Sequence, residues 1–296
     1  MIEEMKPFLP NHVFINGNFG DPIMYPHLLD LIRMYKDAGV PQVTLSTNGS
    51  VHKTDWWEEL ASIMRKPDKV IFAVDGLEDT NHLYRVNTNF KKIMENAQAF
   101  INAGGRARWD YLIFEHSEKD VDRAEQLAKE WGVEKFMKKK TGRFITQSSQ
   151  PKEIHQARNR KGEQTTVLAK PQKKEHQNLA LLKQKEIEKS YGGMMNYYNQ
   201  AKIKCKVANG EKNSIFVTAE GLILPCCWTA GRMYKWWHKD PTVEPVWNHI
   251  NAVGGKDSVN AKVHGLKKVF HSKEIISVFQ FLKYYLHLSS LLYLDK

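Results

Sequence analysis

Short apolar runs rich in β-branched residues alternate with longer segments of helical period along the first half of the chain. The runs predicted as strands are His12–Asn16, Gln42–Thr47, Lys69–Asp75, Ala107–Phe114 and Glu134–Met137. The segments predicted as helices between them are Pro26–Ala38, Asp55–Arg65, Phe90–Ala103 and Asp120–Trp131. Because successive strands are spaced as βαβ crossovers require, the pattern predicts an α/β fold with a parallel sheet.

The pattern changes twice in the second half of the chain. From about Lys138 to Ser190, Lys, Gln, Arg and Ser dominate without a steady period, which predicts a basic insertion or linker. After Tyr191, the runs Ser214–Thr218 and Leu222–Leu224 flank Gly221 in a pattern that predicts a β-hairpin. We therefore expect three parts, residues 1–137, 138–190 and 191–296, of which the last is a small α+β region.

The net charge of +11 is concentrated in one segment. Between Lys135 and Lys185 there are 14 Lys and Arg against three Glu, so the rest of the chain is close to neutral. This distribution keeps nucleic acid as a partner to consider through residues 135–185, but it does not favour that partner over others.

Cysteine content and apolar runs indicate a cytoplasmic protein without a membrane partner. Three cysteines in 296 residues are too few for a secreted disulfide framework. Met1–Pro10 has acidic residues and no apolar run, unlike a signal peptide. Polar residues interrupt Ile275–Leu294, which predicts a packed helix rather than a membrane span.

Residues suited to ligand binding recur at four consecutive predicted strands. They are Gly20 and Asp21 after the first strand, Thr47 and Asn48 at the end of the second, Asp75 and Arg85 at and after the end of the third, and Trp109 within the fourth. Each alone has a simpler explanation as a turn residue or a surface ion pair. Because ligands of parallel sheets bind at the carboxyl ends of the strands, their recurrence predicts one shared site.

At these segments the sequence resembles the radical S-adenosylmethionine (radical SAM) family. "FINGNFGDPIMYPHLLDLIRMYKDAG" resembles the second strand and helix of that family, whose Gly-Gly-Glu-Pro stretch binds the amino group of the cofactor. "VTLSTNGS" resembles its third strand and "VIFAVDGLEDTNHLYR" its fourth. The resemblance covers roughly Val13 to Met137 and implies a partial, open (β/α) barrel that lacks its first strand.

The resemblance also implies a role for each candidate residue. Carried over by position, Gly20 and Asp21 hold the cofactor amino group, Thr47 and Asn48 lie near the ribose, Asp75 and Arg85 approach the ribose and the carboxylate, and Trp109 faces the adenine. The motif has Gly-Asp-Pro where the family usually has Gly-Glu-Pro, so the acid is one methylene shorter.

One feature of the family is missing from this sequence. The family has a CxxxCxxC loop after its first strand that binds a [4Fe–4S] cluster, and the sequence contains no such motif. Because residue 1 lies just before the expected second strand, three explanations stay open. The chain is a fragment of a split or miscalled gene, a partner chain supplies the loop, or the protein has lost radical chemistry.

The three cysteines lie in the third part of the chain. Cys205 precedes Cys226 and Cys227 by 21 and 22 residues, and Gly221 lies five positions before Cys226. This spacing resembles the start of a SPASM-type domain, in which cysteines bind an auxiliary iron–sulfur cluster. The further cysteines of such a set are absent, so buried reduced cysteines are the alternative interpretation.

The resemblance implies an enzyme that reductively cleaves S-adenosylmethionine at a [4Fe–4S] cluster and abstracts hydrogen from a substrate. The SPASM-like region points to a peptide or protein as that substrate. Without the cysteine loop, this chain alone is not expected to carry out the reaction. Two alternatives stay open, namely an inactive module that binds S-adenosylmethionine or RNA, and a decayed scaffold that lacks the cluster.

Overall fold

The computed structural model describes residues 9–17, 20–144, 153–159, 163–193, 196–197, 200, 214–224, 227, 230 and 244–281. The chain forms two compact units, with a boundary between Ser190 and Tyr191. We call Leu9–Ser190 the sheet unit, and we call the unit that contains the described residues from Tyr191 onward the C-terminal unit. Each is described by itself.

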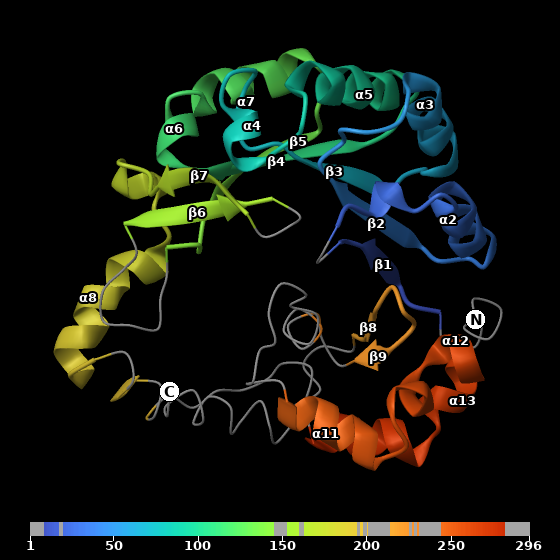
Figure 1. The fold of residues 1–296 in the computed structure, drawn as a ribbon. Coiled ribbons are helices and arrows are strands. Elements are labelled where there is room, and N and C mark those ends of the chain that lie inside the picture. The colour runs from blue at the N-terminus through green and yellow to red at the C-terminus, as the bar shows by residue number, and fades with distance from the viewer. Residues whose placement is uncertain are drawn as a thin grey trace. The chain divides into compact units, whose positions relative to one another are not determined.

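A five-stranded parallel sheet forms the centre of the sheet unit (Figure 1). Its strands are β1 (His12–Ile15), β2 (Gln42–Thr47), β3 (Lys69–Ala73), β4 (Ala107–Ile113) and β5 (Lys135–Lys140), and they lie side by side in chain order. The predicted parallel α/β sheet is therefore confirmed. Pairing of each strand with its neighbour in sequence is typical of the wall of a (β/α) barrel, whereas a doubly wound sheet reverses its order.

Helices cover one face of this sheet (Figure 1). They are α2 (Leu28–Asp37), α3 (Thr54–Ile63), α5 (Phe90–Asn102) and α7 (Val121–Glu130), each close to a predicted helix. Shorter helices lie between the strands and these helices, namely η2 (Pro22–Met24), α4 (Asn81–Tyr84) and α6 (Glu115–Glu118). The main core lies between the helices and the sheet, where Leu45, Trp57 and Phe100 are fully buried.

Alternation of side chains along the strands gives the sheet one apolar and one polar face. In β4, Trp109 and Tyr111 are buried in the main core, while Arg108 and Asp110, which alternate with them, are partly exposed. Residues aligned across parallel strands point to the same side, so the register extends this division over the sheet. The face opposite the core carries mostly polar and charged side chains, and we call it the polar face.

Residues 138–190 contain regular elements that the sequence pattern did not predict. β6 (Ile154–Arg158) and β7 (Gln164–Ala169) form an antiparallel hairpin, which is followed by η3 (Lys174–His176) and α8 (Leu179–Tyr191). Ala157 and Leu168 of the hairpin are buried in a small core with Phe114 and Phe144. The hairpin therefore packs against the residues that follow β4 within the sheet unit.

The C-terminal unit contains the predicted hairpin. β8 (Phe216–Val217) pairs antiparallel with β9 (Ile223–Leu224), and Gly221 between them has φ +95°. A Cβ atom at Gly221 would lie 2.5 Å from Asn260 Oδ1, so both backbone angle and space require glycine here. The hairpin shares a core with the helices that follow, which are α11 (Glu244–Ala252), η5 (Lys256–Val259), α12 (Ala261–His264) and α13 (Leu266–Phe270).

Part of the predicted helix Ile275–Leu294 is described. Ile275 and Val278 are buried in the core of the C-terminal unit, and residues from 282 onward lie outside the described part of the chain. Within the described ranges, no helix combines the length and the apolar character that crossing a membrane requires.

Glu118 ties the segment after β7 to the rest of the sheet unit. Its nearly buried carboxylate accepts hydrogen bonds from the backbone N–H groups of Gln172 and Lys173, both at 3.0 Å, and His176 Nδ1 lies 2.8 Å from Oε1. Burial acts to raise the pKa of Glu118, but the hydrogen bonds from His176, Lys173 and Gln172 outweigh it and hold the pKa below its usual value. The ionised carboxylate is therefore the form that anchors this segment.

We predict that Glu118→Gln lowers the free energy of unfolding by about 1–2 kcal/mol at neutral pH, because a neutral amide is a weaker acceptor for three donors. A carboxyl whose pKa is lowered by folding stabilises above its unfolded pKa and loses this effect as pH falls through its folded pKa. The difference between wild type and variant in urea unfolding should therefore shrink below about pH 4.5. Glu78→Gln, at an exposed position before α4, is the control. A difference that persists unchanged at pH 3 would contradict the assignment.

Candidate functional site

Asp21 joins the loops that follow β1 and β2. Its Oδ1 accepts a hydrogen bond from the Ile23 N–H at 3.2 Å and so caps η2. Its Oδ2 accepts a hydrogen bond from the Asn48 N–H at 2.7 Å. Because a carboxylate offers about four lone-pair positions, Asp21 keeps the capacity to bind a cationic group.

Two glycines shape the loop before Asp21. A Cβ atom at Gly17 would lie 1.8 Å from the carbonyl oxygen of Gly20, so the close approach of these backbone segments requires glycine. A Cβ atom at Gly20 would meet no atom within 4 Å, which shows open space beside its backbone. A ligand held by Asp21 can therefore approach the backbone at Gly20.

Thr47 and Asn48 form the turn at the end of β2. Thr47 is buried, and its Oγ1 accepts a hydrogen bond from the Gly49 N–H at 3.0 Å. Asn48 Oδ1 accepts hydrogen bonds from the N–H and the hydroxyl of Ser50, at 2.9 and 2.6 Å. Thr47 thus shapes the turn, while the side-chain amide nitrogen (Nδ2) of Asn48 has no hydrogen-bond partner among the described residues.

Asp75, which is buried at the end of β3, forms an ion pair with the partly buried Arg85. Arg85 Nε donates to Asp75 Oδ2 at 2.6 Å, and the Leu112 N–H donates to Oδ1 at 2.6 Å. The side chain of Asp75 is 1% exposed and that of Arg85 is 30% exposed. The Asp75 carboxylate is thus buried with one donor at each oxygen, whereas the terminal nitrogens of Arg85 have no hydrogen-bond partner within the described chain.

The charges of this site act on one another. Burial raises the pKa of the Asp75 carboxyl, although Arg85, the Leu112 N–H and Arg143 oppose the shift. Burial also disfavours the charged form of Arg85, but the negative charges of Asp75 and, to a smaller extent, Asp21 hold its pKa above the usual value. The loops after β1 and β2 are thus joined at Asp21, and Arg85, after β3, stands at the same carboxyl edge of the sheet and senses the charge of Asp21.

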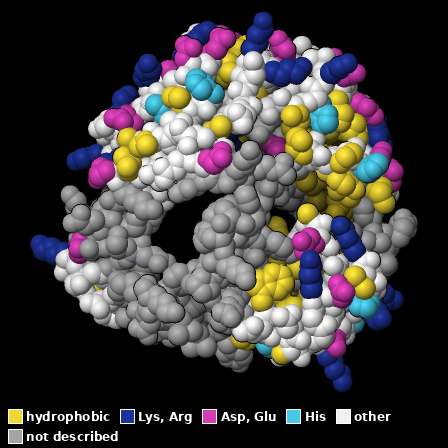
Figure 2. Space-filling view, viewed as in Figure 1, with side chains coloured by type: hydrophobic (Ala, Val, Ile, Leu, Met, Phe, Trp, Pro, Cys, Tyr) yellow, Lys and Arg dark blue, Asp and Glu magenta, His cyan; other side chains and the backbone are white. Residues whose placement is uncertain are grey.

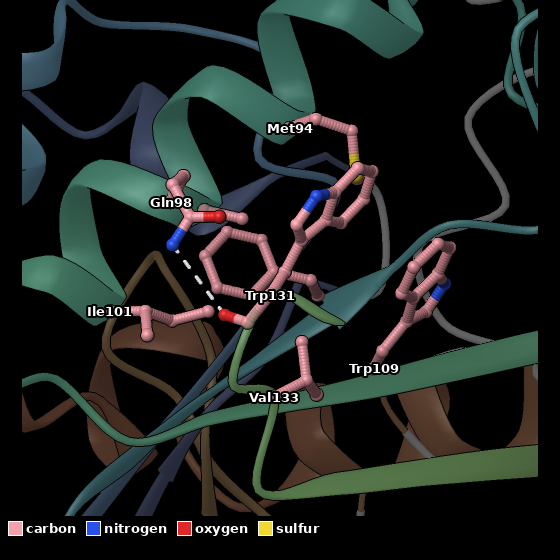
Figure 3. Close-up of a pocket in the computed structure, with 8 residues that line it drawn as sticks. Met94, Gln98, Ile101, Trp109, Trp131 and Val133 are labelled. Atoms are coloured by element: carbon pink, nitrogen blue, oxygen red, sulfur yellow. Dashed lines mark hydrogen bonds between the residues drawn. The ribbon is translucent and has the colours of Figure 1, made fainter. Parts of the chain in front are cut away.

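Trp109 lies apart from this site, on the face of the sheet that the helices cover (Figure 3). Its side chain is 2% exposed, its Nε1 donates to the Val74 carbonyl at 2.8 Å, and its ring lies beside that of Trp131 with centroids 6.2 Å apart. Since the main core encloses the ring, the structure gives Trp109 a packing role rather than the expected contact with a ligand at the carboxyl edge.

Three residues support the site without any sequence motif that marks them. His52 Nε2 lies 2.6 Å from the Ile23 carbonyl oxygen, which links the loop after β2 to η2. Asn96 of α5 is fully buried and donates to the carbonyl oxygens of Gly49 and Val51, at 2.8 and 3.1 Å. The guanidinium of Arg143 lies 5.0 Å from the ring centre of Tyr84, next to Arg85. Only Asn96 had a sequence signal, as a polar residue on the apolar side of an amphipathic helix.

The structure describes one of the three cysteines expected to bind an auxiliary cluster. Cys205 and Cys226 lie outside the described residues, and Cys227 is exposed. Among the residues that the structure describes, no group of three or more His, Cys, Asp or Glu side chains is arranged to bind a metal ion.

Known proteins resemble this chain in structure rather than in sequence. No protein-family profile and no curated protein matches the sequence. A crystal structure of Streptococcus suis SuiB bound to S-adenosylmethionine matches with a TM-score of 0.50 and 12% identity, over 95% of this chain and 60% of SuiB. The chain has the radical SAM fold. A structure of anSMEcpe with bound AdoMet matches with a TM-score of 0.46 and 12% identity, over 95% of this chain and 72% of that chain.

We predict that Asp75→Asn lowers the free energy of unfolding by about 3 kcal/mol, because Arg85 then has no anionic partner in a mostly buried position. The double variant Asp75→Asn/Arg85→Gln should be less destabilised than the sum of the single variants, since no unpaired charge is left. Urea denaturation followed by circular dichroism measures both effects. Asp122→Asn, which removes an exposed ion pair, is the control and should change stability by about 0.5 kcal/mol or less. Additive single effects would exclude the coupling.

Proposed function

We propose that the sheet unit binds S-adenosylmethionine at the carboxyl edge of its sheet. The observation that carries the proposal is the meeting of three loops at one site that offers both signs of charge. S-adenosylmethionine has an ammonium, a carboxylate and a sulfonium, so it needs an anionic and a cationic partner at once. The structure of SuiB, which shares the fold, holds this molecule.

The contacts within the site support a distinct part for each residue. Asp21, beside the open backbone of Gly20, has lone pairs left for the ammonium group. Arg85 has terminal nitrogens left for the carboxylate, and Asp75 orients Arg85 because its own carboxylate is buried, whereas that of Asp21 is partly exposed. The backbone N–H of Asn48 donates to Asp21, and the side-chain amide nitrogen of Asn48 is the candidate partner for a ribose hydroxyl.

We further propose that the chain belongs to a radical SAM protein of the cytoplasm that modifies a peptide or protein. The cofactor supplies, in that family, a 5′-deoxyadenosyl radical when it is cleaved at a [4Fe–4S] cluster. The sequence has no CxxxCxxC motif, so the residues present do not fit this cluster, and no reaction step is assigned to the chain. The chain spans 60% of the length of SuiB, and its own residues support the binding step alone.

We predict that isothermal titration calorimetry detects binding of S-adenosylmethionine to the full chain. Asp21→Asn should weaken binding by about 10- to 100-fold, because it removes the charge that faces the ammonium group. Asp30→Asn is the matched control, since Asp30 is an exposed aspartate whose ion pairs lie on the outer surface of α2, and it should leave the affinity unchanged. Circular dichroism shows whether each variant is folded.

Other outcomes separate the alternatives. A folded wild-type chain that binds no S-adenosylmethionine would support a decayed scaffold. Equal loss of affinity in Asp21→Asn and Asp30→Asn would place the ligand elsewhere. Binding of RNA with a steep dependence on salt, in the absence of binding to S-adenosylmethionine, would favour the RNA-binding module.

A further inference from the structure

The polar face of the sheet is unusually charged for a parallel sheet. Both faces of such sheets are normally covered by apolar packing. Here the strand register places Lys69, Arg108, Asp110, Lys135 and Lys139 on the face opposite the helices. All five are partly or fully exposed, which shows that apolar packing does not cover them.

These charges do not cancel. Asp110 is the acidic member, and its carboxylate is already bound by Arg108, whose Nε and terminal nitrogen lie 2.5 and 2.8 Å from its two oxygens. Lys139 Nζ lies 3.2 Å from Asp110 Oδ2 and keeps 43% of its side chain exposed. Glu134, which precedes β5, is bound at both oxygens by Arg106. The charged residues of this face therefore keep a cationic excess on β3, β4 and β5.

On β1 and β2, the described side chains of the polar face are uncharged near pH 7. His12 of β1 lies 2.9 Å from Thr44 Oγ1 of β2, and burial together with nearby Lys69 lowers the pKa of His12. The neutral imidazole is therefore favoured near pH 7, and among the described strand residues of this face the cations lie on β3, β4 and β5. The acidic Asp21, by contrast, follows β1. The sheet thus separates an acidic group suited to a cationic cofactor from a basic surface suited to an anionic ligand.

We propose that the polar face of β3, β4 and β5 binds an acidic peptide segment, which is the substrate class of the protein. The proposal rests on the proposed function, because it assigns the second ligand of the same sheet. Charge complementarity determines the occupant, since an extended acidic chain that crosses the sheet can place carboxylates against the lysines of β3 and β5, which lie on either side of β4. Single-stranded RNA fits less well, because base stacking needs aromatic rings and the rings that the described strands place on this face, those of His12 and Phe14, lie on β1, at the far edge from β5.

Two adjacent lysines of β5 allow a matched test. Lys139 lies on the polar face and contacts Asp110, whereas Lys138 lies on the helix side and contacts Glu125 of α7 at 3.0 Å. Their side chains are 43% and 39% exposed, so the two substitutions remove the same charge from similar surroundings on opposite faces. Lys135→Gln is a second variant at an exposed position of the polar face.

The experiment measures fluorescence anisotropy of a labelled short peptide of alternating Glu and Gly with the full chain and saturating S-adenosylmethionine. We expect binding that weakens as salt increases, and a three- to tenfold loss, on the order of one lost ion contact, in Lys139→Gln and in Lys135→Gln. Lys138→Gln should bind as wild type does. Calorimetry of Lys139→Gln with S-adenosylmethionine should give the wild-type affinity.

Three results would overturn the proposal. They are equal affinity for a Lys–Gly peptide, equal losses in Lys138→Gln and Lys139→Gln, and tighter binding of oligouridylate than of the acidic peptide. If the wild-type chain binds the acidic peptide with the expected variant pattern but binds no S-adenosylmethionine, then the proposed function fails and peptide recognition by this face stands.

Discussion

The buried pair of Asp75 and Arg85 is the interaction on which the carboxyl edge of the sheet depends. The Asp75 carboxylate accepts a hydrogen bond from the Leu112 N–H of β4 and pairs with Arg85, which follows α4. The Asp75 N–H donates to Asn81 Oδ1 at 2.9 Å. Because an unpaired charge in this environment costs several kcal/mol, these elements keep one arrangement. Arg85 is thereby held at the edge of the sheet with donors left over, which is the property that a ligand carboxylate requires.

Apolar burial on the helix side of the sheet explains why the opposite side can stay open. The main core lies on the helix side of the sheet and supplies its apolar burial, with Leu45, Phe72 and Tyr111 among the fully or nearly fully buried residues. On the surface drawn in Figure 2, acidic and basic side chains lie interspersed over the helices of the sheet unit, as expected of a solvated outer layer. The polar face contributes little to this core, so its side chains are available for recognition.

Sequence patterns predicted the sheet well because period-2 and period-3.6 signals are strong in its first half. β2 begins and ends as predicted, and β4 ends one residue early. The hairpin β6–β7 escaped prediction because its buried residues, such as Ala157 and Leu168, are few among polar neighbours. The place of Trp109 was readable, since alternation in β4 puts it on the same side as Tyr111. The contact of His52 with Ile23 depends on how two loops fold together, which no local pattern encodes.

The division of charge across the sheet follows from the same alternation. A strand such as β5, with the sequence KFMKKK, places consecutive lysines on opposite faces, so one run of basic residues serves two purposes. Lys138 pairs with acids of α7 on the outside, where such pairs add little stability. Lys139 shares Asp110 with Arg108, so the polar face keeps a positive excess. Composition alone associates the basic run of β5 with nucleic acid. In the folded chain, its lysines divide between the outer surface and the polar face.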